Sequence, residues 1–302
     1  MTSAADDRAR RLADEPFRST SSLDRGPAGG LVRQVRDIWR RRELLDMLIR
    51  RELKARYKDS TLGFVWSLMR PLAMLLIYYL ALGKFLGAAR DIPDFAIFIY
   101  TGLTAWGLFS ETVTTATSSI VNNSGLIKKV YLPREIFPIA SLGSSLFNFA
   151  IQLVILTAAT VVVGAFPTGS RWVYLPLALA VIVVWALAWS LLLSAVNVFL
   201  RDVQYLVEIA LMIAFWLSPI VYSWALVDGE LDSAVLKQIF LANPVTLAVI
   251  GFQQTFWVSG DSQLVPPHLE ASLWIALGVG AVFVFVAQRV FARLQGNFAQ
   301  EL

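Results

Sequence analysis

Apolar blocks that are too long for the core strands or core helices of a soluble protein dominate this sequence. Hydrophobic residues make up 57% of its 302 residues and charged residues only 16%, whereas soluble domains average about 45–50% and 25%. About 20 apolar residues cross the hydrocarbon of a bilayer, where a helix satisfies its own backbone hydrogen bonds. We therefore predict an all-α integral membrane protein with about six transmembrane helices, at residues 64–85, 95–120, 136–166, 173–200, 207–224 and 271–291.

Three further segments have a different character. Residues 1–30 are polar and lack the apolar core of a signal peptide, which predicts a disordered cytoplasmic tail ahead of a membrane domain over 31–302. Residues 43–58 predict a basic amphipathic helix in the membrane interface, or, alternatively, a soluble helix that packs on a partner. Residues 235–257 are apolar but interrupted, which predicts a helical hairpin or a re-entrant pair of short helices, held at membrane depth only where protein buries it.

The distribution of charge predicts the orientation in the membrane. One side would hold residues 1–63, the loops near 121–135 and 200–206 and the C-terminus, with 22 Lys and Arg once Arg70 is added, against 4 on the other side. Because the more basic side faces the cytoplasm, both termini are predicted to be cytoplasmic, in a plasma (inner) membrane protein. The chain has no cysteine and a single histidine, His268, which excludes thiolate and histidine-cluster metal sites.

Two short loops on the basic side stand out, at 122–135 and 197–203. Each could fit a groove on a cytoplasmic partner, and each could equally be an ordinary loop anchored by cations that reach the headgroups. No G-x-x-x-x-G-K-[ST] sequence is present, so the chain has no phosphate-binding loop of this type. If ATP drives its activity, another subunit must bind the nucleotide.

The predicted span at 95–120 offers the best candidates for a pore lining. Aromatic faces suit the C–H faces of sugar rings, and a conducting path needs weak contacts at many sites. Glu111 is the sharpest ionisable residue within a span, and it could line a channel, pair with a neighbour or, less readily, relay protons. Ordinary packing or a lipid-interface belt is the alternative for each aromatic residue. The candidates on this span are Tyr100, Trp106, Phe109, Ser110, Glu111 and Thr114.

Four motifs together resemble one known family. They are LIKKVYLPREIFP at 126–138, NVFLRDV at 197–203, FWLSPIVY at 215–222 and LANP at 241–244. In combination, over roughly residues 31–298, the sequence resembles the polysaccharide and polyol-phosphate branch of the ABC-2 transporter permeases. The resemblance implies a homodimer that binds two copies of a separate ABC ATPase subunit, which would hold the ATP and Mg²⁺. This chain itself would have no cofactor, no enzymatic activity and no nucleic acid partner.

The resemblance also implies roles for individual segments. The helix at 43–58 and the loop at 122–132 would contact the ATPase, and 235–257 would form the outer gate helices. The implied ATPase-coupling residues are Arg50, Arg51, Lys54, Lys128, Lys129, Tyr131, Arg134, Glu135, Arg201 and Asp202. The implied gate residues are Asn243, Pro244, Gln253 and Gln254.

The expected cargo is a polysaccharide linked to a membrane lipid. The Ala- and Arg-rich tail suits an actinobacterium, which favours cell-wall galactan over O-antigen or teichoic acid. The alternatives are an ABC-2 exporter of small molecules, a secondary transporter driven by protons or sodium, and a membrane-bound enzyme. The sequence shows neither the inverted repeats and paired mid-membrane charges of the secondary transporter nor the clustered polar residues of the enzyme.

Overall fold

A computed structural model describes residues 36, 40–57, 65–85, 87, 90, 92–129 and 132–302. The chain divides into two units, Met1–Arg40 and Arg41–Leu302, and the description below concerns the second. The tail predicted at 1–30 lies outside the described residues, as does Tyr131. Within the described part of the chain the secondary structure is entirely helical, which confirms the predicted all-α class.

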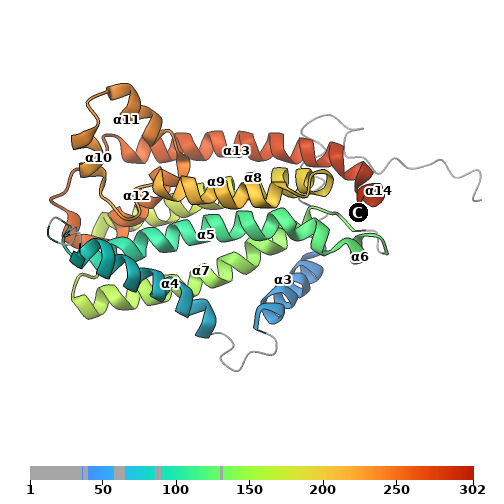
Figure 1. Cartoon of the computed structure of the whole chain (residues 1–302), viewed down its shortest axis with the longest axis horizontal. Coiled ribbons are helices and arrows are strands. Elements are labelled where there is room, and N and C mark those ends of the chain that lie inside the picture. The colour runs from blue at the N-terminus through green and yellow to red at the C-terminus, as the bar shows by residue number, and fades with distance from the viewer. Residues whose placement is uncertain are drawn as a thin grey trace, which may run out of the picture. The chain divides into compact units, whose positions relative to one another are not determined.

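The helices alternate between long rods and short surface or end segments (Figure 1). Their bounds are α3 Arg42–Tyr57, α4 Val65–Tyr78, the π-helix η2 Tyr79–Phe85, α5 Phe95–Asn122, α6 Ser124–Ile127, α7 Ile136–Val163, η4 Gly169–Val173, α8 Tyr174–Phe199, α9 Val203–Trp216, α10 Trp224–Glu230, α11 Ala234–Leu241, α12 Pro244–Phe256, η5 Val258–Gly260, α13 Leu269–Leu294, η6 Gln295–Asn297 and α14 Phe298–Glu301.

The long helices pack side by side, and α5 and α8 lie at the centre. α5 contacts α4, α7, α8, α9 and α12, and α8 packs against α13 on its other side. In Figure 1 the helices α3, α6 and α14 lie at one end of this bundle, here named the α3 end, and α10 and α11 lie at the opposite, α10 end. A large apolar cluster fills the interior toward the α10 end, and a smaller one around Ile136, Phe137 and Phe298 fills the α3 end.

Within the described residues, three helices are long and apolar enough to cross a membrane: α7, η4 with α8, and α13. The bent pair α11 and α12 would make a fourth, and the apolar helices at Pro71–Phe85 and Val203–Trp216 are shorter than a span. The predicted number of six spans therefore stays a prediction, whereas a protein with several membrane-crossing helices is confirmed.

α5 is long, at 28 residues, but its second half is rich in serine and threonine. These hydroxyls hydrogen-bond to carbonyls of their own helix: Thr115 Oγ1 donates to the Glu111 carbonyl at 2.8 Å and Thr117 Oγ1 to the Val113 carbonyl at 2.7 Å. Because α5 is packed by other helices on several sides and several of its hydroxyls donate within the helix, it does not need the lipid-facing apolar surface of α7 or α13.

α9 is shorter than the apolar block predicted at 207–224. It begins at Val203 and ends at Trp216 after 14 residues, which is about 21 Å of helix and less than the hydrocarbon thickness. Residues 217–223 are not helical, and α10 begins only at Trp224. Pro219 explains the break, because a proline disfavours the helical conformation of the residue before it.

The backbone beyond α9 is hydrogen-bonded by side chains from neighbouring segments. Gln253 Nε2 on α12 donates to the Pro219 carbonyl at 2.7 Å, and Thr246 Oγ1 donates to the Leu217 carbonyl at 3.3 Å. The Tyr222 hydroxyl donates to the Trp216 carbonyl at 2.6 Å. Carbonyls left over at the end of a helix are costly in a low-dielectric interior, and these donors remove that cost.

The short helices predicted at 235–257 are present as α11 and α12, which meet at an angle of 82°. Asn243 and Pro244 form the break: the Asn243 carboxamide oxygen accepts a hydrogen bond from the Val245 backbone N–H at 3.0 Å, and Pro244 occupies the first helical turn. Asparagine at the N-cap followed by proline is a strong helix start. Nearly all of α12 is buried, between α5, α7, α8 and α13.

We predict that Gln253→Leu destabilises the fold because it leaves the Pro219 carbonyl without this donor. The expected loss in the free energy of unfolding is about 1–3 kcal/mol. The neighbouring Gln254 is the matched control, because its contact to Arg171 uses its backbone carbonyl and not its side chain. Thermal unfolding of the two leucine variants in detergent measures the difference, and equal melting temperatures would contradict the assigned hydrogen bond.

Candidate functional site

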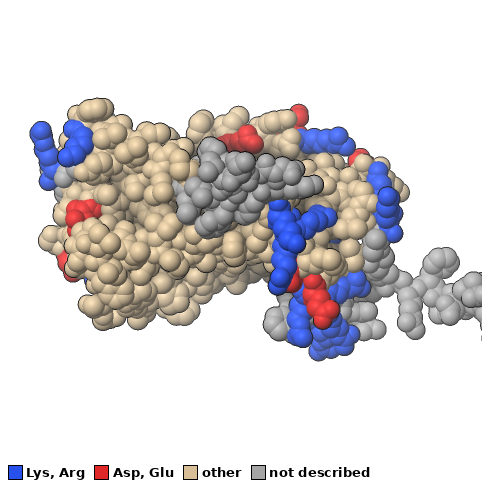
Figure 2. All heavy atoms as spheres, turned by 90° about the horizontal axis from the view of Figure 1, so that it is seen from below, with Lys and Arg blue, Asp and Glu red and all other residues tan. Residues whose placement is uncertain are grey.

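Cations are distributed unequally between the two ends of the bundle, and Figure 2 shows Lys and Arg gathered at the ends on the face that it displays. The α10 end carries Lys84, Arg90, Arg171 and Lys237. The α3 end carries Arg41, Arg42, Arg50, Arg51, Lys54, Lys128, Lys129, Arg134, Arg201 and Arg293. The loops that the charge count assigns to the cytoplasm therefore lie together at one end of the bundle, the α3 end.

α3 packs its apolar side on the first half of α7. Leu48 is buried in the cluster at the α3 end, and Ile49 lies so close to Gly143 that a Cβ atom at Gly143 would come within 2.5 Å of the Ile49 Cδ1 atom. The Glu52 carboxylate accepts hydrogen bonds from Ser141 Oγ at 3.2 Å and from Ser144 Oγ at 2.9 Å. The sequence analysis missed Glu52, which ties this surface helix to a membrane-crossing one.

The cations of α3 lie on its exposed side. Arg50 forms an ion pair with Asp46 at 2.7 Å, but both side chains are well exposed, so the pair contributes little stability. Arg51 donates a hydrogen bond to the Asn123 carboxamide oxygen, which links α3 to the segment that contains α6. Lys54 is exposed, as are Lys128 and Lys129 after α6. This exposed basic surface of α3 and α6 is available to a partner at the α3 end.

Arg134 and Glu135 behave differently from the other coupling candidates because they face protein. The Arg134 guanidinium lies 5.5 Å from the centroid of the Phe298 ring. Glu135 is only 4% exposed, and one of its carboxylate oxygens accepts a hydrogen bond from Gln295 Nε2 at 3.4 Å. Burial raises the pKa of the Glu135 carboxyl above its ordinary value, although Gln295 and Arg134 oppose the shift.

The second predicted loop lies at the same end. Arg201 and Asp202 are exposed between α8 and α9, and the Asp202 carbonyl accepts the first backbone hydrogen bonds of α9, from Tyr205 at 3.1 Å and Leu206 at 3.2 Å. Phe199, just before the loop, packs on Phe298. The structure therefore brings all the described coupling candidates to the α3 end, and seven of them are exposed: Arg50, Arg51, Lys54, Lys128, Lys129, Arg201 and Asp202.

The six pore candidates on α5 divide into two groups. The rings of Tyr100, Trp106 and Phe109 are buried inside the chain, where Trp106 packs on Phe109 and on Phe215 of α9 with ring centroids 5.9 and 5.8 Å apart. The three polar candidates face outward instead. They belong to a line of half-buried or exposed residues at helical spacing, here named the polar stripe: Gly107, Ser110, Glu111, Thr114 and Ser118.

Glu111 is held by a side chain of the next long helix. Asn148 Nδ2 on α7 donates to Glu111 Oε1 at 2.7 Å, and Gln152, one turn further along α7, comes close to Gly107 of the polar stripe. Neither amide was singled out in the sequence, because α7 is strongly apolar as a whole. Asn148 and Gln152 of α7 thus place polar side chains beside Glu111 and Gly107 of α5, where the two helices meet.

The end of α12 is fastened to the α10 end of the bundle. Arg171 Nη1 donates to the Gln254 carbonyl at 3.0 Å, and the same guanidinium forms an ion pair with Asp261. Trp257 Nε1 donates to the Pro93 carbonyl at 2.6 Å, which connects this region to the start of α5. Among the predicted gate residues, Asn243 and Pro244 form the break between α11 and α12, Gln253 donates to the Pro219 carbonyl, and Gln254 contributes its own carbonyl.

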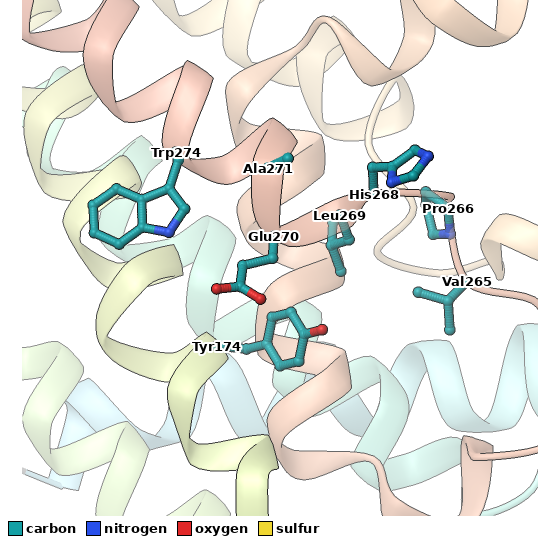
Figure 3. Close-up of a pocket in the computed structure, with 8 residues that line it drawn as sticks. All are labelled: Tyr174, Val265, Pro266, His268, Leu269, Glu270, Ala271 and Trp274. Carbon is teal, nitrogen blue, oxygen red and sulfur yellow. The ribbon is translucent and has the colours of Figure 1, made fainter.

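A shallow hollow lies at the α10 end, between the starts of α8 and α13. Figure 3 shows the Glu270 carboxylate lying between the rings of Trp274 and Tyr174, with Val265 and Leu269 beside them. His268 begins α13 with a left-handed backbone, at φ 57°, and its ring points away from the carboxylate in this view. The hollow is built by segments other than those that carry the polar stripe.

Comparisons with known proteins agree over most of the chain. Residues 43–257 match the family model described as ABC-2 type transporter. The chain is 29% identical to the O-antigen export system permease protein RfbA of Myxococcus xanthus over 272 residues, which cover 90% of this chain and 100% of that protein. It is 26% identical to a protein of the same name from Klebsiella pneumoniae over 261 residues, which cover 86% of this chain and 95% of that one.

We predict that Glu135→Gln stabilises the fold at neutral and alkaline pH. Because the pKa of Glu135 is raised in the folded chain, the folded state holds a proton that the unfolded chain releases above about pH 4.5, so the stability due to this group falls as the pH rises through the raised pKa. Glutamine does not ionise and keeps a hydrogen-bonding group beside Gln295. The melting temperature of the variant should exceed that of the wild type at pH 8, and the gap should close near pH 4.5. A gap that does not change with pH would contradict the raised pKa.

Proposed function

This chain belongs to the ABC-2 type transporter family, and we propose that it is the permease subunit of an ATP-driven exporter that moves a lipid-linked polysaccharide out across the plasma membrane. The observation that carries the proposal is the similarity to O-antigen export permeases over nearly the whole of both chains. The family match also means that the chain is a transport component, so we expect it to have no enzymatic activity of its own.

The polar stripe supports a path for a hydrophilic cargo. Hydroxyl and carboxamide groups at membrane depth are costly against lipid, so they mark surfaces that face protein or a solute path. Ser110, Thr114 and Glu111 offer donors and acceptors for sugar hydroxyls on a side of α5 that is half-buried or exposed among the described residues. In a homodimer, a second polar stripe opposite the first would enclose the path. The rings of Tyr100, Trp106 and Phe109 would then support the path from behind.

The energy would come from two copies of a separate ATPase subunit that hold ATP and Mg²⁺. Exposed cations on α3, after α6 and between α8 and α9 offer a contact surface at the α3 end, which we place in the cytoplasm with both termini. Closure of the ATPase dimer would displace these surface segments, and the membrane helices would follow. This coupling is mechanical and requires no reaction in the permease.

The relatives indicate the class of cargo, and the identity of its sugar is a separate prediction. The relatives are named for O-antigen export, whereas the composition of the tail led us to expect galactan, with teichoic acid as a further member of the class. A proton-coupled transporter is the main rival. It would require inverted repeats around a mid-membrane site, and the sequence shows no convincing repeat.

The proposal is tested by co-expression of the chain with an ABC ATPase encoded beside it. We expect the two proteins to purify as one complex whose ATP hydrolysis is stimulated by lipid-linked glycan in proteoliposomes, and we expect deletion of the gene to leave the glycan on the cytoplasmic face. A chain that purifies alone and moves solute on a proton gradient without nucleotide would refute it.

We predict that charge reversal at the exposed segment after α6 uncouples ATP hydrolysis from transport. The double variant Lys128→Glu/Lys129→Glu should lower cargo-stimulated hydrolysis by about tenfold while the protein still inserts in the membrane. The matched control is Lys84→Glu/Arg90→Glu, which makes the same change of charge at the α10 end and should keep stimulated hydrolysis near the wild-type rate. Equal losses in both variants would remove Lys128 and Lys129 from the coupling role.

A further inference from the structure

The C-terminal residues fold back against the bundle at the α3 end. After α13, the short helix α14 places Phe298 in the interior, where its side chain is 0% exposed. Its ring packs on the rings of Phe199, with centroids 6.0 Å apart, and of Phe291, with centroids 5.5 Å apart. The Arg134 guanidinium lies 5.5 Å from the centroid of the same ring. Figure 1 shows α14 at the same end as α6 and α3.

These contacts reach both of the loops that carry coupling candidates. Phe199 is the last residue of α8, directly before Leu200, Arg201 and Asp202. Arg134 lies at the other end of the loop that begins after α5. Gln295, one turn before Phe298, adds the hydrogen bond to Glu135. One C-terminal turn therefore contacts the base of both loops, although they are more than sixty positions apart in the sequence.

Such a contact has a mechanical consequence. Lys128, Lys129, Leu200 and Arg201 are exposed, so a partner can push on both loops, and Ile127 beside Lys128 packs in the same apolar cluster as Phe298. Perpendicular ring pairs and a cation over a ring face have preferred geometries. A fully buried ring that makes such contacts to both loop bases joins them through a dense interior that transmits displacement.

We propose that Phe298, together with Gln295, acts as a clamp that holds the described parts of the two cytoplasmic loops, 123–129 with 132–135 and 200–202, in fixed relation, so that a displacement of one by the ATPase moves the other. Phe298 is thus a positioning residue. Its effect on coupling to ATP hydrolysis rests on the proposed function. The fixed distance between the loops depends only on contacts within this chain, so it can be measured without the ATPase.

The distance between the loops can be measured directly because the chain contains no cysteine. Spin labels at Gly125→Cys and Leu200→Cys, two exposed positions outside the coupling set, report it by pulsed electron resonance on the full chain without ATPase. The clamp predicts a narrow distance distribution that widens in Phe298→Ala. The matched control is Phe256→Ala, since Phe256 is also 0% exposed but packs on Trp172 at the α10 end, and it should leave the distribution narrow.

A second variant covers the case in which Phe298→Ala fails to fold. Gln295→Ala removes the hydrogen bond to Glu135 from a half-buried position, and it should widen the distribution to a smaller extent. A distribution as narrow as that of the wild type in the folded Phe298 variant, or in Gln295→Ala where Phe298→Ala does not fold, would overturn the clamp. The clamp would also be overturned if Phe256→Ala widened the distance distribution as much as Phe298→Ala, or as Gln295→Ala where Phe298→Ala does not fold.

The functional consequence is measured separately on the complex with the ATPase. In Phe298→Ala, or in Gln295→Ala if the first variant does not fold, cargo-stimulated hydrolysis should fall by at least about fivefold relative to the wild type, while basal hydrolysis and complex formation persist. Stimulation equal to that of the wild type would overturn the coupling role. If the wild-type complex itself shows no stimulation by lipid-linked glycan, the proposed function fails, and the spin-label distances still decide whether the clamp exists.

Discussion

The requirement that every backbone carbonyl and N–H be hydrogen-bonded away from water governs this fold. It is met inside each long helix, but α9 stops after Trp216 and leaves a non-helical stretch through Pro219. Donors on α12 complete that stretch, and the last carbonyls of α12 are in turn approached by Arg171. α9 and the bent pair α11 and α12 therefore depend on each other for these hydrogen bonds, and neither would be stable at membrane depth without the other.

The same requirement explains why polar residues concentrate on α5. Ser110 and Ser118 of the polar stripe donate to carbonyls of their own helix, those of Gly107 and Thr115. Their oxygens can still accept hydrogen bonds on the face of the polar stripe. A helix of this composition is poorly suited to face lipid, and it is packed on several sides by α4, α7, α8, α9 and α12. The side that carries the polar stripe, half-buried or exposed among the described residues, is thus the wall that we propose for a hydrophilic path.

The sequence alone predicts the helices and their breaks well where local chemistry determines them. The Asn243-Pro244 cap and the basic loops appear where local signals place them, whereas α9 ends at Trp216, well before the end of the apolar block at 207–224. Burial is less predictable, because the side of a helix that is covered depends on other helices that are distant in the sequence. Tyr100, Trp106 and Phe109 are therefore buried although they were considered for a pore, and the contact of Phe298 with two distant loops has no local signal at all.

The link between the surface helix and the polar stripe runs along a single face of α7. Ser144 binds Glu52 of α3, and Asn148, four residues later and so one turn along the same face, binds Glu111 of α5. A displacement of α3 relative to the bundle would therefore act on the helix that positions the carboxylate of the stripe. The intervening turn is part of a continuous α-helix, and it holds the two hydrogen bonds at a fixed separation. In a membrane, where these bonds have few competing partners, one rigid turn of α7 with a polar contact to α3 and another to α5 can carry a small movement inward.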